Sequence, residues 1–287
     1  MTDIAPGDPL GLYREESLRR LQGGGIPFAA AQRLAALRGP AAGLFTSELS
    51  VEAFGLTRHA QLRPVSQVMG SGVFDVATGL GPDDDRRNQA RVAALHRMWL
   101  EGRECGAHLV AGITLRENTV AESSSTQFLE FTATGTALAW TSRPGASAQD
   151  AGEAAPRAGE PTLTSLSVQD CLQLLRHGYR PLALVAATRI LGVHRDDTVL
   201  PGREDTQAAR VVKLLYHSAM EAVRAEAAGL KAAGIVGLAV RREMLRRPGL
   251  TPAAAVHVIG TAIARVRGGD PAGPASPVPV LPLGGRV

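Results

Sequence analysis

Two nearly identical pentapeptides decide the fold: GTALA at residues 135–139 and GTAIA at residues 260–264. Gly135 and Gly260 lie 125 residues apart, and the same spacing separates Gly112 from Gly237 in the segments HLVAGITLR and AGIVGLAVR. No gap is needed between the two glycines of either copy. The same strand-like pattern is therefore written twice in one chain.

A second pair of segments extends the match towards the N-terminus. LSVEAFGLTRHAQLRP begins at Leu49 and LSVQDCLQLLRHGYRP begins at Leu166, an offset of 117 residues, and each runs to a proline. The change of offset from 117 to 125 places eight extra residues in the intervening loop of the second copy, where insertions are tolerated. The sequence therefore predicts a tandem duplication.

Each copy predicts the element order α-β-α-β-β. Ser50 and Ser167 are suitable N-caps for a short helix, and we expect Pro64 and Pro181 to stop it. A β-rich run, a polar loop and a longer helix follow. Spacings of three and four residues place one apolar face on that helix, listed here for the two copies: Leu95, Met98, Gly102 and Cys105; Met220, Val223, Ala227 and Leu230.

Two further strands close each unit, and the small residues of the second strand fall on one side at period two. Small residues on a strand face allow another element to approach closely. We therefore expect an α+β fold in which helices pack on a small, mainly antiparallel sheet. The predicted domains are a helical N-terminal extension at 1–44, repeat 1 at 45–140, a flexible linker at 141–161, repeat 2 at 162–267 and a disordered Pro/Gly-rich tail at 268–287.

Composition and charge exclude several classes of protein. Hydrophobic residues make up 45% of the 287 residues, but no apolar run approaches the roughly 18 residues of a transmembrane helix. The N-terminus has no signal-peptide pattern, so we expect a cytoplasmic protein without a membrane partner. The net charge is +4, with basic residues scattered among 27 acids. The densest cluster, RREMLRR at 241–247, is better interpreted as a solvated hairpin tip than as a nucleic-acid site.

The repeated motifs resemble those of the YbjQ-like family, whose domains are described as heavy-metal-binding. The matching segments are TSELS before a short helix, a helix that ends in CGAHLVAGI, and a closing TGTAL. The residues that carry the match are Gly106, Ala107, Gly112, Gly135, Thr136 and Ala137 in copy one, and Ala232, Gly237, Gly260, Thr261 and Ala262 in copy two. The resemblance implies an α+β fold and homo-oligomers, commonly rings of five. Lys231 stands where copy one has Gly106, so we expect a different turn there.

Metal chemistry has weak support in the sequence. Metal binding requires several His, Cys, Asp or Glu donors at one point, and the histidines form no HxxxH motif or Cys/His cluster. Cys105 and His108 are the best candidate pair, but Leu230 and Ala233 occupy those positions in copy two. Packing and surface roles therefore remain the favoured interpretation of both residues. A cofactor is not identified; a divalent metal ion at an interface between chains stays open.

Three hypotheses for function remain. The first is a structural or scaffolding oligomer, because the repeated motifs are packing motifs. The second is a metal-binding protein, and the third is a small-ligand binder with its site between repeats or subunits. An enzyme is not expected, because no P-loop, GxSxG or GxGxxG motif is present and no nucleophile–base pair can be identified. For the oligomer we predict a homopentamer with two stacked rings of repeats; a dimer with a pseudo-twofold axis is the alternative.

Overall fold

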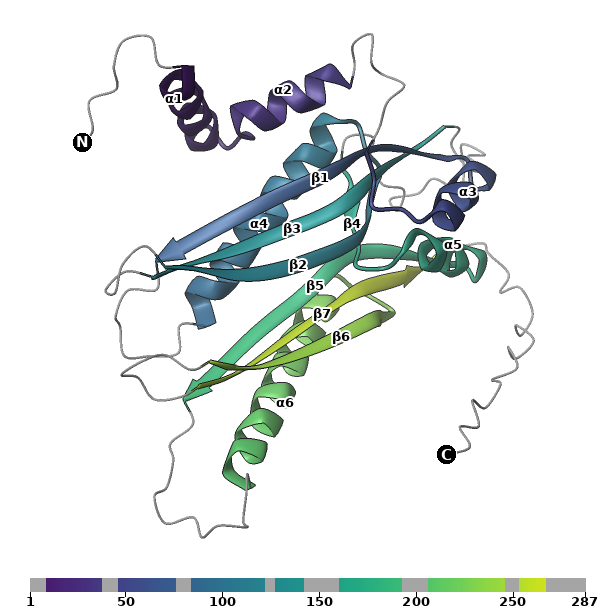
Figure 1. Ribbon diagram of the computed structural model, residues 1–287. Coiled ribbons are helices and arrows are strands. Elements are labelled where there is room, and N and C mark those ends of the chain that lie inside the picture. Colours follow the sequence, from purple (N-terminus) through teal and green to yellow (C-terminus); the bar gives the residue numbers. More distant parts are fainter. Residues whose placement is uncertain are drawn as a thin grey trace, which may run out of the picture.

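The computed structural model describes residues 9–37, 46–75, 84–121, 127–141, 160–192, 206–245 and 253–266. It confirms the α+β class: six helices and two sheets lie in these ranges. The sheets lie one below the other in Figure 1, each with a long helix along one face. The predicted linker and tail lie almost wholly outside the described residues.

The first sheet has the strand order β1-β3-β2-β4. Strands β1, β3 and β2 are antiparallel neighbours, whereas β4 is parallel to β2. The bounds are β1 Leu62–Asp75, β2 Leu109–Ala121, β3 Gln127–Trp140 and β4 Thr162–Leu163. Helix α4 (Asp84–Glu104) covers one face. The short strand β4 belongs by sequence to the predicted second repeat, so it crosses the expected domain boundary.

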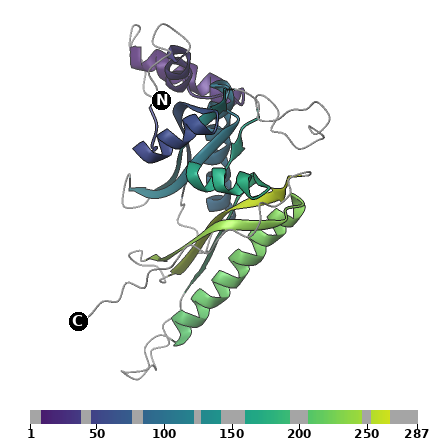
Figure 2. The same cartoon turned by 90° about the vertical axis from the view of Figure 1, so that its right-hand side faces the viewer.

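The second sheet has the order β5-β7-β6, with both pairs antiparallel. Its strands are β5 Tyr179–Gly192, β6 Gly234–Leu245 and β7 Ala253–Arg265. Helix α6 (Thr206–Gly229) runs along its outer face, which Figure 2 shows clearly. The short helices α3 (Val51–His59) and α5 (Val168–Arg176) lie side by side at one end of the sheets.

Both predicted helix caps are confirmed. The Ser50 hydroxyl accepts a hydrogen bond from the Ala53 N–H, and the Ser167 hydroxyl accepts one from the Asp170 N–H. The prediction that prolines stop these helices is wrong, because the helices end five residues earlier and Pro64 and Pro181 lie inside β1 and β5. Each proline sits at an irregularity of the strand register, where a missing N–H costs no ladder bond.

The turns before these strands use left-handed backbone. Gln61 has φ 57° and Gly178 has φ 74°, so the helix turns back through a conformation that glycine adopts freely. The turn after each long helix is likewise left-handed, with φ 72° at Gly106 and 54° at Lys231. The expected difference at Lys231 is therefore wrong: the turn keeps its left-handed backbone and a lysine adopts it.

The apolar faces of the long helices form the core. Met98 and Val223 are fully buried, and so are Ala133 and Ala137 on the predicted face of β3. Leu230 is the exception, since it is exposed at the end of α6. The predicted hairpin tip at 241–247 is described only in part: Arg241–Leu245 forms the end of strand β6, and residues 246–247 lie outside the described residues. One further expectation is corrected, because α4 already begins at Asp84 within the expected loop DDDRR.

The N-terminal helices pack on the end of α4, at the top of Figure 1. They are α1 (Pro9–Gln22) and α2 (Phe28–Ala36), and Leu34 of α2 is buried against Leu100. Arg33 pairs with Glu101 at 2.6 Å, which holds α2 to α4. None of the helices in the described part of the chain combines the length and apolar character that crossing a membrane requires.

Candidate functional site

Cys105 and His108, the metal candidates from the sequence, lie at the end of α4 and just before β2. The Cys105 thiol is half-buried beside the packed ends of α2 and α4, and its Sγ lies 3.3 Å from the Gly102 carbonyl oxygen. Burial raises the pKa of this thiol to about 11, which disfavours the thiolate that metals bind. His108 Nδ1 accepts a hydrogen bond from the Trp140 N–H at 3.4 Å.

These two residues acquire no third ligand. Across the described ranges, no three His, Cys, Asp or Glu side chains lie close enough together to hold a metal ion. A zinc site needs four ligands, at least three of them from protein. The described residues therefore present packing and hydrogen-bonding roles for Cys105 and His108.

The repeated Gly-Thr-Ala motifs occupy the centres of β3 and β7. A Cβ on Gly135 would lie 2.9 Å from Val110 Cγ1, and one on Gly260 would lie 2.9 Å from Ile235 Cγ2. Both glycines thus allow the neighbouring strand's side chains to pack across them. The adjacent Ala137 and Ala262 are fully buried.

The threonines of these motifs hold the segment before each short helix. Thr136 Oγ1 accepts a hydrogen bond from the Glu48 N–H at 3.2 Å, and Thr261 Oγ1 accepts one from the Ser165 N–H at 3.1 Å. Both threonines are buried, so these bonds form away from water. The motif is therefore architectural in both halves: it fixes an extended segment beside the sheet.

The junction between the two halves combines polar and apolar contacts. Its first part is strand addition: residues 162–166 run along the outer edge of β2 (Figure 1). The bonds are Thr162 N–H to the His108 carbonyl (3.0 Å), Thr164 N–H to Val110 (3.0 Å), Gly112 N–H to Leu166 (2.8 Å) and Ile113 N–H to Thr164 (3.1 Å). Gly112 has φ 68°, and the resulting irregularity in β2 turns its N–H towards the added segment.

The second part of the junction joins α4 to the edge of β5. The buried Arg91 guanidinium donates to the Ala186 carbonyl at 2.7 Å and to Thr188 Oγ1 at 3.3 Å. Asn88 Oδ1 accepts a hydrogen bond from the Thr188 N–H at 3.2 Å. Burial lowers the pKa of Arg91 to about 10, and the carboxylate of Glu226 opposes that shift. The arginine stays charged at neutral pH and satisfies part of the buried edge of β5, which pairs with no other strand of the described residues.

His257 extends this polar cluster. Its Nδ1 lies 3.1 Å from Thr188 Oγ1. Burial lowers the pKa of His257 to about 4, with a further contribution from the charges of Arg87, Arg241 and Arg91, so the imidazole is neutral at pH 7. Its buried Nε2 has no hydrogen-bond partner in the described part of the chain.

Sequence reasoning missed this cluster because its members lie about 100 residues apart and belong to different halves. The individual residues carry no local signal: Arg91 sits in an ordinary helix and His257 in an ordinary strand.

The close approach of α4 to β1 was also missed, although the sequence does contain a signal for it. Gly70 and Gly72 alternate along β1, and a Cβ on them would lie 2.0 Å from the Ala94 carbonyl oxygen and 2.1 Å from that of Ala90. Glycines at period two on a strand indicate a helix at close approach.

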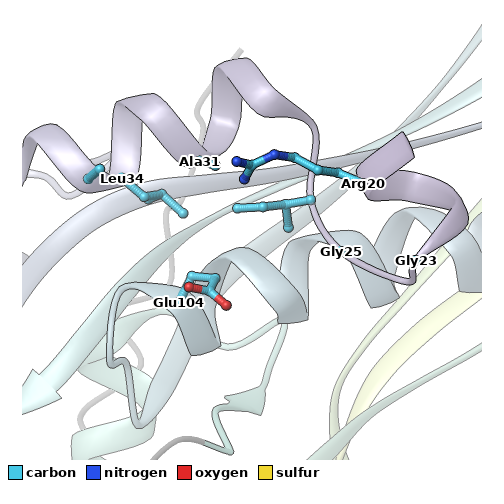
Figure 3. A pocket seen from close by; sticks show the side chains of 8 residues that line it. Arg20, Gly23, Gly25, Ala31, Leu34 and Glu104 are labelled. Carbon is cyan, nitrogen blue, oxygen red and sulfur yellow. The ribbon is translucent and has the colours of Figure 1, made fainter. Parts of the chain in front are cut away.

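A pocket of about 410 Å³ lies between the α1–α2 connection and the end of α4 (Figure 3). Its walls are mostly aliphatic or backbone, with one guanidinium and one carboxylate. The lining residues are Arg20, Gly23, Gly25, Ile26, Ala31, Leu34, Ala35 and Glu104. The lining contains no nucleophile and no histidine, so it offers a shape for an apolar group rather than a catalytic centre.

Comparisons with known proteins give a partial match. No family model matches the chain. The chain is 33% identical over 150 residues to the "Encapsulin nanocompartment protein Rv1762c" of Mycobacterium tuberculosis (strain ATCC 25618 / H37Rv), which covers 49% of this chain and 54% of that protein. The chain thus spans about half the length of this relative.

One similar solved structure is a protein of unknown function of the DUF74 family from Pediococcus pentosaceus ATCC 25745. It is 26% identical, and the match covers 31% of this chain and 86% of that one, with a TM-score of 0.26. A likeness at that TM-score carries no argument about this chain.

Proposed function

We propose that this chain is a non-enzymatic, self-assembling structural protein built from two YbjQ-like units. The observation that carries the proposal is the apolar surface at the two outer sheet edges. Met69 and Val73 are exposed on β1, and Leu238, Val240 and Met244 are exposed on β6. Apolar side chains gathered along a strand edge are typical of a surface that binds another protein.

The duplication is supported by contacts at equivalent positions. Glu101 of α4 accepts a hydrogen bond from the Met69 N–H at 2.8 Å, and Glu226 of α6 accepts one from the Ala186 N–H at 3.3 Å. These pairs keep the offsets of 125 and 117 residues seen in the sequence. Together with the two caps and the two motif threonines, they support a common origin of the halves.

The relative's name supports assembly, because it places that protein in a nanocompartment. For this chain we propose a homo-oligomer, and specifically a homopentamer that holds ten units. Rings suit heterologous interfaces, which close by rotation. The alternative of a metal-ion or small-ligand binding protein has less support, since the described residues bring no donor set together.

Native mass spectrometry at micromolar concentration tests this proposal. The expected result is a single species of five chains. A monomer would contradict self-assembly altogether. A dimer would retain self-assembly but replace the pentamer by the pseudo-twofold arrangement.

A further inference from the structure

We infer that the open edge of the second half binds the open end of the first half in another copy of this chain, and that this contact repeats the junction seen inside the chain. The inference rests on the proposed self-assembly and adds to it the surface, the partner and the orientation. It follows from a comparison of each junction residue with the residue at the equivalent position of the other half.

Within the chain, β2 is the strand to whose edge residues 162–166 are added. We call this the donor edge, and its equivalent in the second half is β6. Ile113 is only 4% exposed, in a core cluster that also contains Leu184 and Ala186 of β5, whereas the equivalent Leu238 of β6 is 43% exposed. Ala111 and Val110 are buried, while Val236 and Ile235 remain partly exposed. Strand β6 is the outer strand of its sheet, and no other strand of the described residues pairs with its outer edge; the side chain of Leu166 packs beside Gly237.

The receiving side is formed by α5 and β5 in the second half and by α3 and β1 in the first. Here it is the second half whose residues are buried and the first half whose residues are exposed. Val168 at the start of α5 is 2% exposed, and the equivalent Val51 at the start of α3 is 90% exposed. Ile190 of β5 is 6% exposed, and the equivalent Val73 of β1 is 57% exposed. Apolar residue types are thus kept at positions that are buried in one half and exposed to water in the other, and Val168 is buried in one cluster with Leu109 and Ala111 of β2.

The backbone of the free receiving segment is already in place. The Glu48 N–H is bonded to Thr136 just as the Ser165 N–H is bonded to Thr261, which holds residues 46–49 beside their own sheet. The donor edge is also prepared, because Gly237 has φ 61°, close to the 68° of Gly112. In β2 the left-handed backbone turns the Gly112 N–H outward, and we expect the same for the Gly237 N–H in β6.

Transferring the internal bonds to the open surfaces gives the expected contact. The Gly237 N–H donates to the Leu49 carbonyl, the Leu238 N–H donates to the Ser47 carbonyl, and the Ser47 N–H donates to the Ile235 carbonyl. Val51 is then covered by the partner as Val168 is covered within the chain. This is strand addition between copies, and because the two surfaces differ, the contact is head-to-tail.

The test uses one charged substitution on each surface. Val51→Asp blocks the receiving end, and Leu238→Asp blocks the donor edge, with Val240→Asp as a second donor variant. Both surfaces are exposed in the single chain, so the circular dichroism of each variant should match the wild type. Val92→Asp is the matched control, since Val92 is an exposed valine (57%) on the outer face of α4. Native mass spectrometry is expected to give monomers for the three surface variants and the wild-type oligomer for the control.

Mixing two variants then tests the orientation. Val51→Asp retains a donor edge and Leu238→Asp retains a receiving end, so an equimolar mixture should form dimers with one chain of each kind and nothing larger. Wild-type oligomers that survive in all surface variants would overturn this interface while leaving self-assembly intact. Monomeric variants that do not form mixed dimers would overturn the head-to-tail orientation. A monomeric wild type would overturn both this inference and the proposed function.

Discussion

Replacing Gly70 by alanine tests the close approach of α4 to β1. The new Cβ would lie 2.0 Å from the Ala94 carbonyl oxygen and 2.5 Å from the Met98 backbone nitrogen. Both are helix backbone atoms, so the methyl group cannot be accommodated by rotating a side chain. Overpacking of this kind costs about 1–3 kcal/mol, and we expect the upper end. The lower entropy of the unfolded alanine chain offsets about 0.5 kcal/mol, which leaves a net loss of about 2.5 kcal/mol.

Urea unfolding followed by tryptophan fluorescence measures this loss. The chain has two tryptophans, Trp99 on α4 and Trp140 at the end of β3, so the signal reports on the first half. Gly55→Ala is the matched control: its Cβ would meet nothing within 4 Å inside helix α3, where alanine is favoured by about 0.5–1 kcal/mol. Equal unfolding midpoints for Gly70→Ala and the wild type would refute the close packing.

Three other outcomes are expected. Lys231→Gly should raise the free energy of unfolding by about 0.5–1 kcal/mol in urea, because the left-handed φ of 54° strains a lysine; a loss would contradict that strain. As the pH falls from 6.5 to 4, the free energy of unfolding should decrease by up to about 3 kcal/mol. In this range His257 is protonated in the unfolded chain but stays neutral in the folded protein, where its pKa is about 4. His257→Asn should flatten this slope, and exposed His217→Asn should not. Calorimetry with Zn²⁺ or Cu²⁺ should show no submicromolar site; one that disappears on replacing Cys105 and His108 would restore the metal hypothesis.

Local rules account for the parts of the fold that could be predicted. The serine caps depend on one side chain and a nearby N–H, and the buried face of β3 depends on strict alternation, so each is visible within a few residues. The proline prediction failed because a strand edge can absorb a proline at an irregular register. The Lys231 prediction failed because the backbone hydrogen bonds that end the helix, from the Lys231 N–H to the Ala228 carbonyl and from the Ala232 N–H to the Ala227 carbonyl, hold the left-handed turn on a residue that disfavours it.

The candidate surfaces could be predicted less well, for a different physical reason. The junction joins residues such as Arg91 and Ala186, whose hydrogen bond spans 95 positions of sequence. Periodicity within a segment says nothing about such pairing. The two offsets of the predicted repeats, 117 and 125 residues, do contain part of the answer, because they identify which buried residue corresponds to which exposed one. Val168 is buried, whereas Val51 at the equivalent position is exposed. Only this contrast shows that the surface of the second half is covered within the chain and that the equivalent surface of the first half is not.

The two junctions of the proposed assembly are not identical. Within the chain, Arg91 and His257 form the polar cluster on β5. At the equivalent positions the sequence has Tyr216 and Thr132, so the junction between copies contains neither the guanidinium nor the imidazole. Partners are distinguished by differences in binding free energy, including repulsive terms. In the proposed assembly, this difference in charge between the two junctions determines which half of one chain binds which half of the next.

The edge of β1 supplies the repulsive term. Two guanidinium groups of its own half already bind it: Arg33 donates to the Gln67 carbonyl at 2.8 Å, and Arg97 donates to the Ser71 carbonyl. If the first half of another chain docked there, its Arg91 would lie at the edge that Arg97 already binds. The charge of Arg33 there is compensated by Glu101, so Arg97 is the like charge that makes this docking costly. If the second half docks there instead, the neutral Tyr216 occupies the position of Arg91. First halves are thereby disfavoured as partners of first halves. In the proposed assembly the two kinds of unit therefore alternate, which differs from the two stacked rings of like repeats expected from the sequence.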